Sequence, residues 1–196
     1  MKLFVFTLLS IITFSAFSQG TVAPQAKINW MTWDEAVAQS KIDSVPKKMF
    51  IDFYTGWCGW CKRMDKTTFI DPNVANYMNA NFYAVKFDAE TTDTINFNGT
   101  TFTNSEPGFK KASANARGKV HMMAYSMLDA KLSYPSYAIL DEHKTRLMIY
   151  SGAKQPDQMM GILVFFATDQ YKYYHNYLYG QWTKQSQIKV QAGGKK

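Results

Sequence analysis

Apolar residues gather into short, dense runs along the chain. KMFIDFYT at 48–55 and FYAVKFD at 82–88 have strand length and few polar positions, which is typical of strands buried on both faces. SYAIL at 136–140 and TRLMIYSG at 145–152 follow each other closely and predict an antiparallel hairpin. The pattern therefore predicts a central sheet made of both buried strands and this hairpin.

Helix signals precede each buried strand. Thr32 followed by Glu35 has the spacing of a capping box, so we expect a helix over 33–41. The Asp-Pro pair at 71–72 is typical of an N-cap and a first helical turn, and predicts a helix that runs to about residue 79. These helices would alternate with the strands.

Two further helices are expected in the second half of the chain. HMMAYSMLDAKL at 121–132 predicts a helix that leads to the hairpin, and Gln155 with Pro156 begins a helix through residue 167. The tyrosine-rich segment 168–185 is expected to extend this last helix. Its aromatic surface either packs back on the domain or forms a homodimer contact.

A polar stretch interrupts the hydrophobic pattern. Residues 89–119 are rich in Thr, Asn, Ser and Gly and poor in periodic hydrophobic positions, so we expect a loop-like insertion. Asn98 begins an N-glycosylation triplet within it. A chain of 196 residues suits one ordinary domain, which we place at 19–185, followed by a disordered tail at 186–196.

The first eighteen residues differ from the rest. The segment 1–18 has a lysine after the start, an apolar run over 3–14, and the small residues Ala16 and Ser18. This is typical of a cleaved signal peptide, whereas the alternative, an uncleaved membrane anchor, needs roughly 20 apolar residues. We therefore predict a periplasmic or secreted protein with no stable membrane insertion after cleavage.

Charge and motifs indicate which classes of partner and cofactor to expect. The formal net charge is +7, but lysine and arginine never form a block of five, so the basicity does not indicate a nucleic-acid partner. The sequence lacks a nucleotide, flavin or haem motif. We expect no cofactor other than a redox-active disulfide.

The chain has two cysteines, Cys58 and Cys61, within GWCGWCK. They could form a redox pair, part of a metal site, or two inert thiols. His121, His143 and His175 are scattered without paired spacing, which argues against a metal site. Export favours disulfide chemistry, because thiols are kept reduced in the cytosol. We therefore favour the redox pair and expect no metal.

The cysteines follow a strand and a tight turn, so Cys58 is expected at a helix N-terminus. Exposed amides there stabilise a thiolate and lower the cysteine pKa from about 8.5 toward about 7 or lower. Cys58 would then be the nucleophile, and Cys61, about one turn further on, would resolve a mixed disulfide.

Asp52 is a carboxylate in the middle of the buried run MFIDFY. Burying it is costly unless it has a partner or a task. One interpretation is a carboxyl with a raised pKa that exchanges a proton with Cys61. The alternative is an aspartate at a strand end that reaches solvent or caps a loop.

DFYTGWCGWCK resembles the active-site strand and turn of thioredoxin, whose characteristic aspartate, tryptophan and lysine correspond here to Asp52, Trp57 and Lys62. The segment that follows is similar to an exported thioredoxin-like group that includes the periplasmic domain of transmembrane disulfide reductases. The resemblance covers 48–88 and returns at LSYPSYAILDEH, residues 132–143. It implies an α/β thioredoxin fold: a central mixed sheet flanked by helices, a polar insertion before the cis-proline block, and an extended C-terminal helix.

The resemblance also implies a substrate-binding surface. Thioredoxin-like proteins place a cis-proline opposite the cysteine pair, and Pro135 corresponds to it, with Tyr134 offering backbone hydrogen bonds to substrate. Trp57, Gly59 and Trp60 would complete the surface. From the residues alone, an ordinary trans proline at the start of an edge strand stays an alternative.

Together these features predict an exported thiol-disulfide oxidoreductase that reduces protein disulfides and is recycled by an unidentified electron donor. Gly59-Trp60 departs from the Gly-Pro of thioredoxin, so a disulfide oxidase or isomerase is the first alternative, and an oxidase would be recycled by an electron acceptor. The second alternative is a protein-binding or folding-assistance module in which redox chemistry is secondary.

Overall fold

The computed structural model describes residues 27–104 and 119–174 together with residues 176 and 178. The predicted signal peptide at 1–18 and the predicted tail at 186–196 lie outside these residues. Among the described residues, no helix has both the length and the apolar character needed to cross a bilayer.

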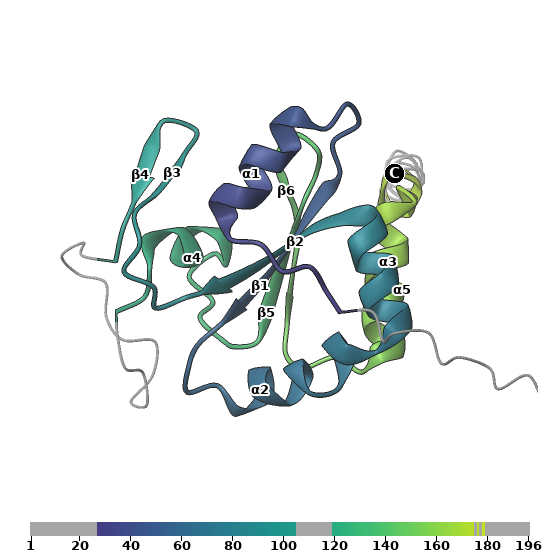
Figure 1. Ribbon diagram of the computed structural model, residues 1–196, viewed down its shortest axis with the longest axis horizontal. Helices are drawn as coiled ribbons and strands as arrows, with labels where there is room; N and C mark the ends of the chain where they lie inside the picture. The colour runs from purple at the N-terminus through teal and green to yellow at the C-terminus, as the bar shows by residue number, and fades with distance from the viewer. Residues whose placement is uncertain (1–26, 105–118, 175, 177, 179–196) are drawn as a thin grey trace, which may run out of the picture.

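A four-stranded sheet lies at the centre of the molecule, in the order β2-β1-β5-β6 (Figure 1). Strands β1 (Lys48–Tyr54) and β2 (Phe82–Asp88) occupy the two dense apolar runs and pair in parallel, with β2 at one end of the sheet order. Strands β5 (Ser136–Leu140) and β6 (Arg146–Ser151) form the predicted antiparallel hairpin. Met31 adds a parallel bridge to Val85 of β2.

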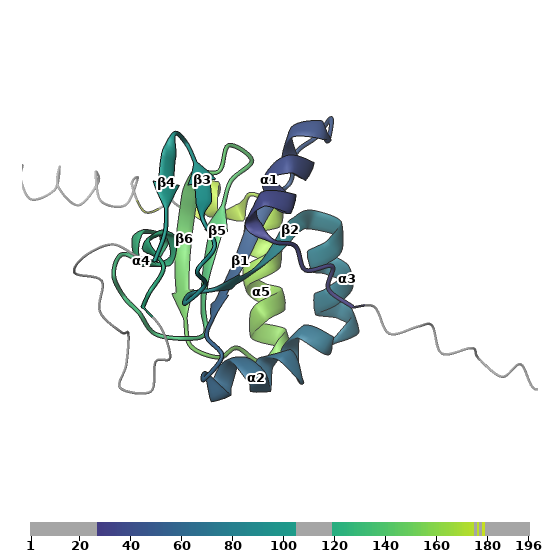
Figure 2. The same ribbon diagram turned by 60° about the vertical axis from the view of Figure 1, so that its left-hand side comes forward.

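Helices cover both faces of the sheet (Figures 1 and 2). On one face, α1 (Trp33–Ile42) and α4 (Met122–Met127) contribute Trp33, Met123 and other side chains to one apolar cluster. On the other face, the elements α2 (Gly59–Asp65), η1 (Thr68–Ile70), α3 (Pro72–Asn81) and α5 (Pro156–Ala167) pack on a second cluster.

Local capping signals determine where the helices begin. Thr32 and Glu35 form the predicted capping box of α1. Asp71 accepts hydrogen bonds from two backbone amides of α3, with Pro72 in its first turn. The β-α-β unit, the hairpin and the flanking helices confirm the predicted thioredoxin fold.

The interpretation of 89–119 as loop-like was wrong for part of this segment. Strands β3 (Ile95–Phe97) and β4 (Thr100–Phe102) form an antiparallel hairpin (Figure 1). Asn98 and Gly99 have φ values of 50° and 76°, as a tight Asn-Gly turn requires. The ring of Phe97 contacts Trp33 edge-on, with 4.8 Å between ring centroids, and this contact anchors the hairpin to the core. Residues 105–118 lie outside the described part of the chain.

Two predicted helices differ from those in the structure. The helix over 121–132 ends at Met127, because Asp129 and Ala130 take left-handed φ values of 51° and 59°. The C-terminal helix is not continuous, since α5 ends at Ala167 and the φ of Asp169 is 59°; helical residues resume at 170. Tyr173 and Tyr174 are exposed, and a homodimer through this segment stays a prediction.

Candidate active site

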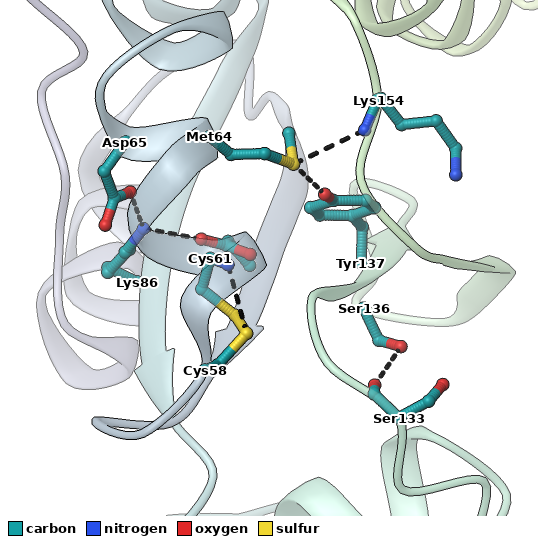
Figure 3. The surroundings of a disulfide bond; sticks show 10 residues. Cys58, Cys61, Met64, Asp65, Lys86, Ser133, Ser136, Tyr137 and Lys154 are labelled. Carbon is teal, nitrogen blue, oxygen red and sulfur yellow. Dashed lines mark hydrogen bonds and ion pairs between the residues drawn. A yellow bond between two sulfur atoms is a disulfide. The ribbon is translucent and has the colours of Figure 1, made fainter.

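The cysteine pair lies at the end of β1, where the chain turns into α2. Cys58 is the N-cap of this helix, as predicted, and forms a disulfide with Cys61 (Figure 3). The amide of Cys61 donates a hydrogen bond to Cys58 Sγ over 3.0 Å. Cys58 is 4% exposed and Cys61 is 2% exposed, so only a small part of the disulfide reaches the surface.

Asp52 lies beneath α2, in the middle of the sheet. Strand register places it between Lys86 of β2 and Tyr137 of β5. Residues paired across neighbouring strands point to the same face of the sheet. Tyr137 and Met64 of α2 belong to the same apolar cluster, so Asp52 points to the sheet face on which α2 packs. Asp52 is 1% exposed and therefore does not reach solvent, which excludes the alternative of an exposed strand-end carboxylate.

Asp52 has one charged partner and one unpartnered oxygen. Lys86 Nζ donates to Asp52 Oδ2 over 2.6 Å. Among the described residues, the buried Oδ1 atom has no hydrogen-bond partner. Burial raises the pKa of Asp52 to about 6; Lys86 opposes this rise, and the nearby Asp65 carboxylate adds to it. Asp52 is therefore a carboxyl that changes protonation near neutral pH.

Lys86 links this buried carboxylate to a surface pocket. Its ammonium group also donates to Asp65 of α2 (Figure 3). Burial lowers the pKa of Lys86, but Asp52 and Asp65 outweigh this effect and raise it. The lysine side chain is 19% exposed, at a pocket of about 410 Å³ whose walls include Trp30 and Phe69. Neither Lys86 nor Asp65 lies in a motif that points to this site in the sequence.

The predicted substrate residues form a wall beside the disulfide. The Tyr134-Pro135 bond is cis, as predicted from the resemblance. The ring of Tyr134 contacts Trp57 edge-on, with 6.0 Å between ring centroids. Trp57 Nε1 donates to Glu90 over 3.0 Å, a contact that sequence reasoning missed. The wall therefore joins the segment before the cysteines to the cis-proline segment.

Only some backbone groups at this wall form hydrogen bonds with other backbone groups in the described part of the chain. Gly152 N donates to the carbonyl of Pro135 over 2.8 Å. Within the described part of the chain, neither the amide nor the carbonyl of Tyr134 pairs with another backbone group. Burial, with smaller contributions from Glu90 and Asp88, raises the pKa of Tyr134, so its phenol stays neutral.

Gly59 and Trp60, between the cysteines, face outward. Trp60 is 57% exposed, and the Arg63 guanidinium lies 5.3 Å from its ring centroid. A Cβ atom at Gly59 would meet open space, so packing does not require glycine at this position. Lys62, directly after Cys61, is also exposed.

On its inner side, α2 is held by Met64. The Tyr137 hydroxyl donates to Met64 Sδ, and the amide of Lys154 approaches the same sulfur over 3.5 Å (Figure 3). These contacts tie the helix to β5 and to the segment before α5. Sequence reasoning did not find them because they depend on residues about 70 to 90 positions apart.

The described residues do not bring together three His, Cys, Asp or Glu side chains that could hold a metal ion. His121 is buried as the N-cap of α4, where it accepts a hydrogen bond from Met123 N and contacts the carbonyl of Asp93. His143 is exposed, and the side chain of His175 lies outside the described residues.

Comparison with known proteins agrees with this geometry. A family model described as "Thioredox_DsbH: Protein of unknown function, DUF255" matches residues 18–108. A thiol:disulfide interchange protein DsbD from Citrobacter koseri is 36% identical over 61 residues, which are 30% of this chain and only 11% of that protein.

Similar solved structures are more distant in sequence. A structure titled DsbH oxidoreductase has 16% identity and a TM-score of 0.48, over 79% of this chain and 94% of that chain. A putative disulphide-isomerase from Bacteroides thetaiotaomicron has 21% identity and a TM-score of 0.46, over 71% of this chain and 91% of that chain. The strand topology is that of a thioredoxin fold, and the segment that the family model matches contains β1, the cysteine pair and β2.

Proposed function

We propose that this protein is an exported thiol-disulfide oxidoreductase that reduces protein disulfides through Cys58 and Cys61. The disulfide at the start of α2, on the sheet face that holds a buried carboxyl with a pKa of about 6, carries this proposal. Similarity to a thiol:disulfide interchange protein supports protein thiols and disulfides as the substrates.

In the reduced protein, Cys58 would be the nucleophile. The Cys61 amide that now donates to Cys58 Sγ would stabilise a thiolate on the same atom. This thiolate attacks one sulfur of a substrate disulfide, and the other substrate sulfur leaves with the bonding electron pair. Cys61 then attacks Cys58 Sγ, which releases the second substrate thiol and closes the disulfide again. Two electrons pass to the substrate, and a dithiol donor must restore them.

Asp52 would accept the proton that Cys61 loses when it attacks. A base is most effective when its pKa lies near the working pH, and burial brings this carboxyl to about 6. Its unpartnered Oδ1 is available for this exchange, while Oδ2 stays bonded to Lys86.

Trp57, Gly59, Trp60, Tyr134 and Pro135 would contact the substrate. The amide and carbonyl of Tyr134, which pair with no other backbone group among the described residues, could form strand-like hydrogen bonds with an extended substrate segment. The predicted signal peptide supports export, and electron transfer to substrate requires the chain to meet a reducing partner in that compartment.

Cysteine variants test the proposal, because the chain has no other thiol. Cys58→Ser should abolish the reduction of insulin disulfides by dithiothreitol-recycled protein. Cys61→Ala, reduced and mixed with the same substrate, should accumulate mixed disulfides that dithiothreitol releases. Full activity of Cys58→Ser would refute the proposal and favour a binding module instead.

The reduction potential tests the direction of electron flow. A value near the roughly −270 mV of thioredoxin would support a reductase. A value near the roughly −120 mV of a strong oxidant would reverse the direction and assign a disulfide oxidase.

A further inference from the structure

The outer side of α2 is basic and carries an exposed aromatic ring next to the disulfide. Lys62, Arg63 and Lys66 are exposed on it, and Trp60 stacks against the Arg63 guanidinium. We call these four residues the α2 face. A shallow groove lined by Trp60, Arg63 and Gly59 crosses it.

The α2 face keeps its positive charge because its helix offers no free carboxylate to neutralise it. Asp65 is the acidic residue of α2, and it accepts a hydrogen bond from Lys86. Arg63 and the lysines at 62 and 66 form none of the ion pairs found among the described residues.

The wall on the other side of Cys58 has the opposite charge. Glu90 accepts from Trp57, the residue directly before Cys58, and both Glu90 and Asp88 act electrostatically on Tyr134. The residue directly before Cys58 therefore contacts an acidic side chain, and the helix that follows Cys58 carries the basic face. A substrate with a matching charge distribution would be attracted, and the reverse distribution would be repelled.

We propose that the α2 face selects protein substrates whose disulfide is flanked by aspartate or glutamate, with these carboxylates against Lys62, Arg63 and Lys66. An apolar substrate side chain would lie in the groove on Trp60. This inference rests on the proposed oxidoreductase function and specifies the substrate class of the same site. Because the acidic wall at Glu90 would repel anions, a protein segment with both acidic and other residues fits the site better than a uniformly anionic surface.

Two synthetic peptides test this selectivity. They carry the same intramolecular disulfide, flanked in one by three glutamates and in the other by three lysines. The second-order rate constant of the reduced protein is measured with each peptide, and with uncharged 2-hydroxyethyl disulfide as a reference. We expect the acidic peptide to react about tenfold faster at low ionic strength, and the ratio to fall as salt screens the charges.

Charge-reversed variants locate the effect. Lys62→Glu/Lys66→Glu should bring the ratio to about one or below, because it reverses two cations of the α2 face. Lys41→Glu/Lys131→Glu makes the same change in net charge at exposed positions outside α2 and should keep the wild-type ratio. Because the readout is a ratio, a change in cysteine reactivity alone does not move it.

The outcomes separate this inference from the proposed function. If 2-hydroxyethyl disulfide and both peptides fail to react, the oxidoreductase function is refuted. If all three react but the peptide ratio is one, or the two double variants behave alike, the inference is overturned and the function stands. Binding to phosphatidylglycerol vesicles that only Lys62→Glu/Lys66→Glu abolishes, with a peptide ratio of one, would assign the face to membranes and also overturn it.

Discussion

Replacing Asp52 with asparagine should make the disulfide-bonded protein more stable at neutral pH. Asparagine has nearly the same shape as aspartate but cannot ionise. Asp52 is 1% exposed, and its pKa is about 6 in the folded protein, against an ordinary value of 3.8. The folded state therefore disfavours the charged carboxylate, even with Lys86 bonded to it.

The sign and size of the effect follow from this difference in pKa. Below about pH 3 the carboxyl is protonated in both the folded and the unfolded states, so it adds no pH-dependent cost. As pH rises from about 3 to above 6, the unfolded state loses its proton first, and the free energy of unfolding falls. A rise in pKa from 3.8 to about 6 corresponds to roughly 3 kcal/mol at full ionisation. Asp52→Asn should lack this fall.

Urea unfolding of both proteins from pH 4 to pH 8 measures the effect. The stability difference between Asp52→Asn and the wild type removes the contributions of groups that titrate in both proteins. We expect this difference to grow by up to about 3 kcal/mol in favour of the variant, mostly between pH 4 and pH 6.5. Asp34→Asn, which makes the same substitution at an exposed position of α1, is the control.

A difference that stays constant over this range would refute the reasoning, because it would mean that Asp52 titrates alike in the folded and unfolded states. A variant that becomes less stable than the wild type as pH rises would reverse the sign. The ion pair with Lys86 would then outweigh the cost of burial.

Asp65→Asn should lower the pKa of Asp52 below about 6, because the Asp65 carboxylate raises it; carboxyl chemical shifts followed with pH measure this change. Tyr137→Phe removes the hydroxyl that donates to Met64 Sδ, and should cost about 1 kcal/mol of stability in urea unfolding at pH 7. Burial lowers the pKa of His121, so the stability of the wild type relative to His121→Asn, which keeps a capping side chain, should fall as pH drops below about 6.5 in urea unfolding. A stability difference between the two proteins that stays constant with pH would contradict this.

Elements with local signals could be predicted closely from the sequence. The capping box at Thr32 and the Asp-Pro pair at 71–72 each satisfy backbone amides within one turn, so a few neighbouring residues determine where these helices begin. Strand β2 matches its predicted range because apolar side chains on both faces leave few alternatives to burial. Cys58 at the helix start follows from the same kind of local pattern.

Features that depend on distant partners could not be predicted in this way. The strands of the β3-β4 hairpin are only three residues long, and the hairpin packs on the core through Ile95 and through Phe97, whose ring contacts Trp33. Its Asn-Gly turn was a usable signal, but the triplet was interpreted only as a glycosylation site. Lys86 is a charged residue within a predicted buried strand, yet only the pairing of β1 with β2 places it against Asp52.

Burial of Asp52 connects the stability of the protein to its proposed chemistry. A carboxyl with the ordinary pKa of 3.8 would be a weak base toward a thiol, whereas one near 6 accepts a proton more readily at neutral pH. The same shift makes the ionised folded state less stable. Asp52→Asn should therefore gain stability at pH 7 and resolve mixed disulfides more slowly, and the wild-type rate should rise with pH through about 6 while the variant rate does not. A variant that gains stability but keeps the wild-type rate and pH profile would show that Cys61 gives its proton to another acceptor, such as solvent.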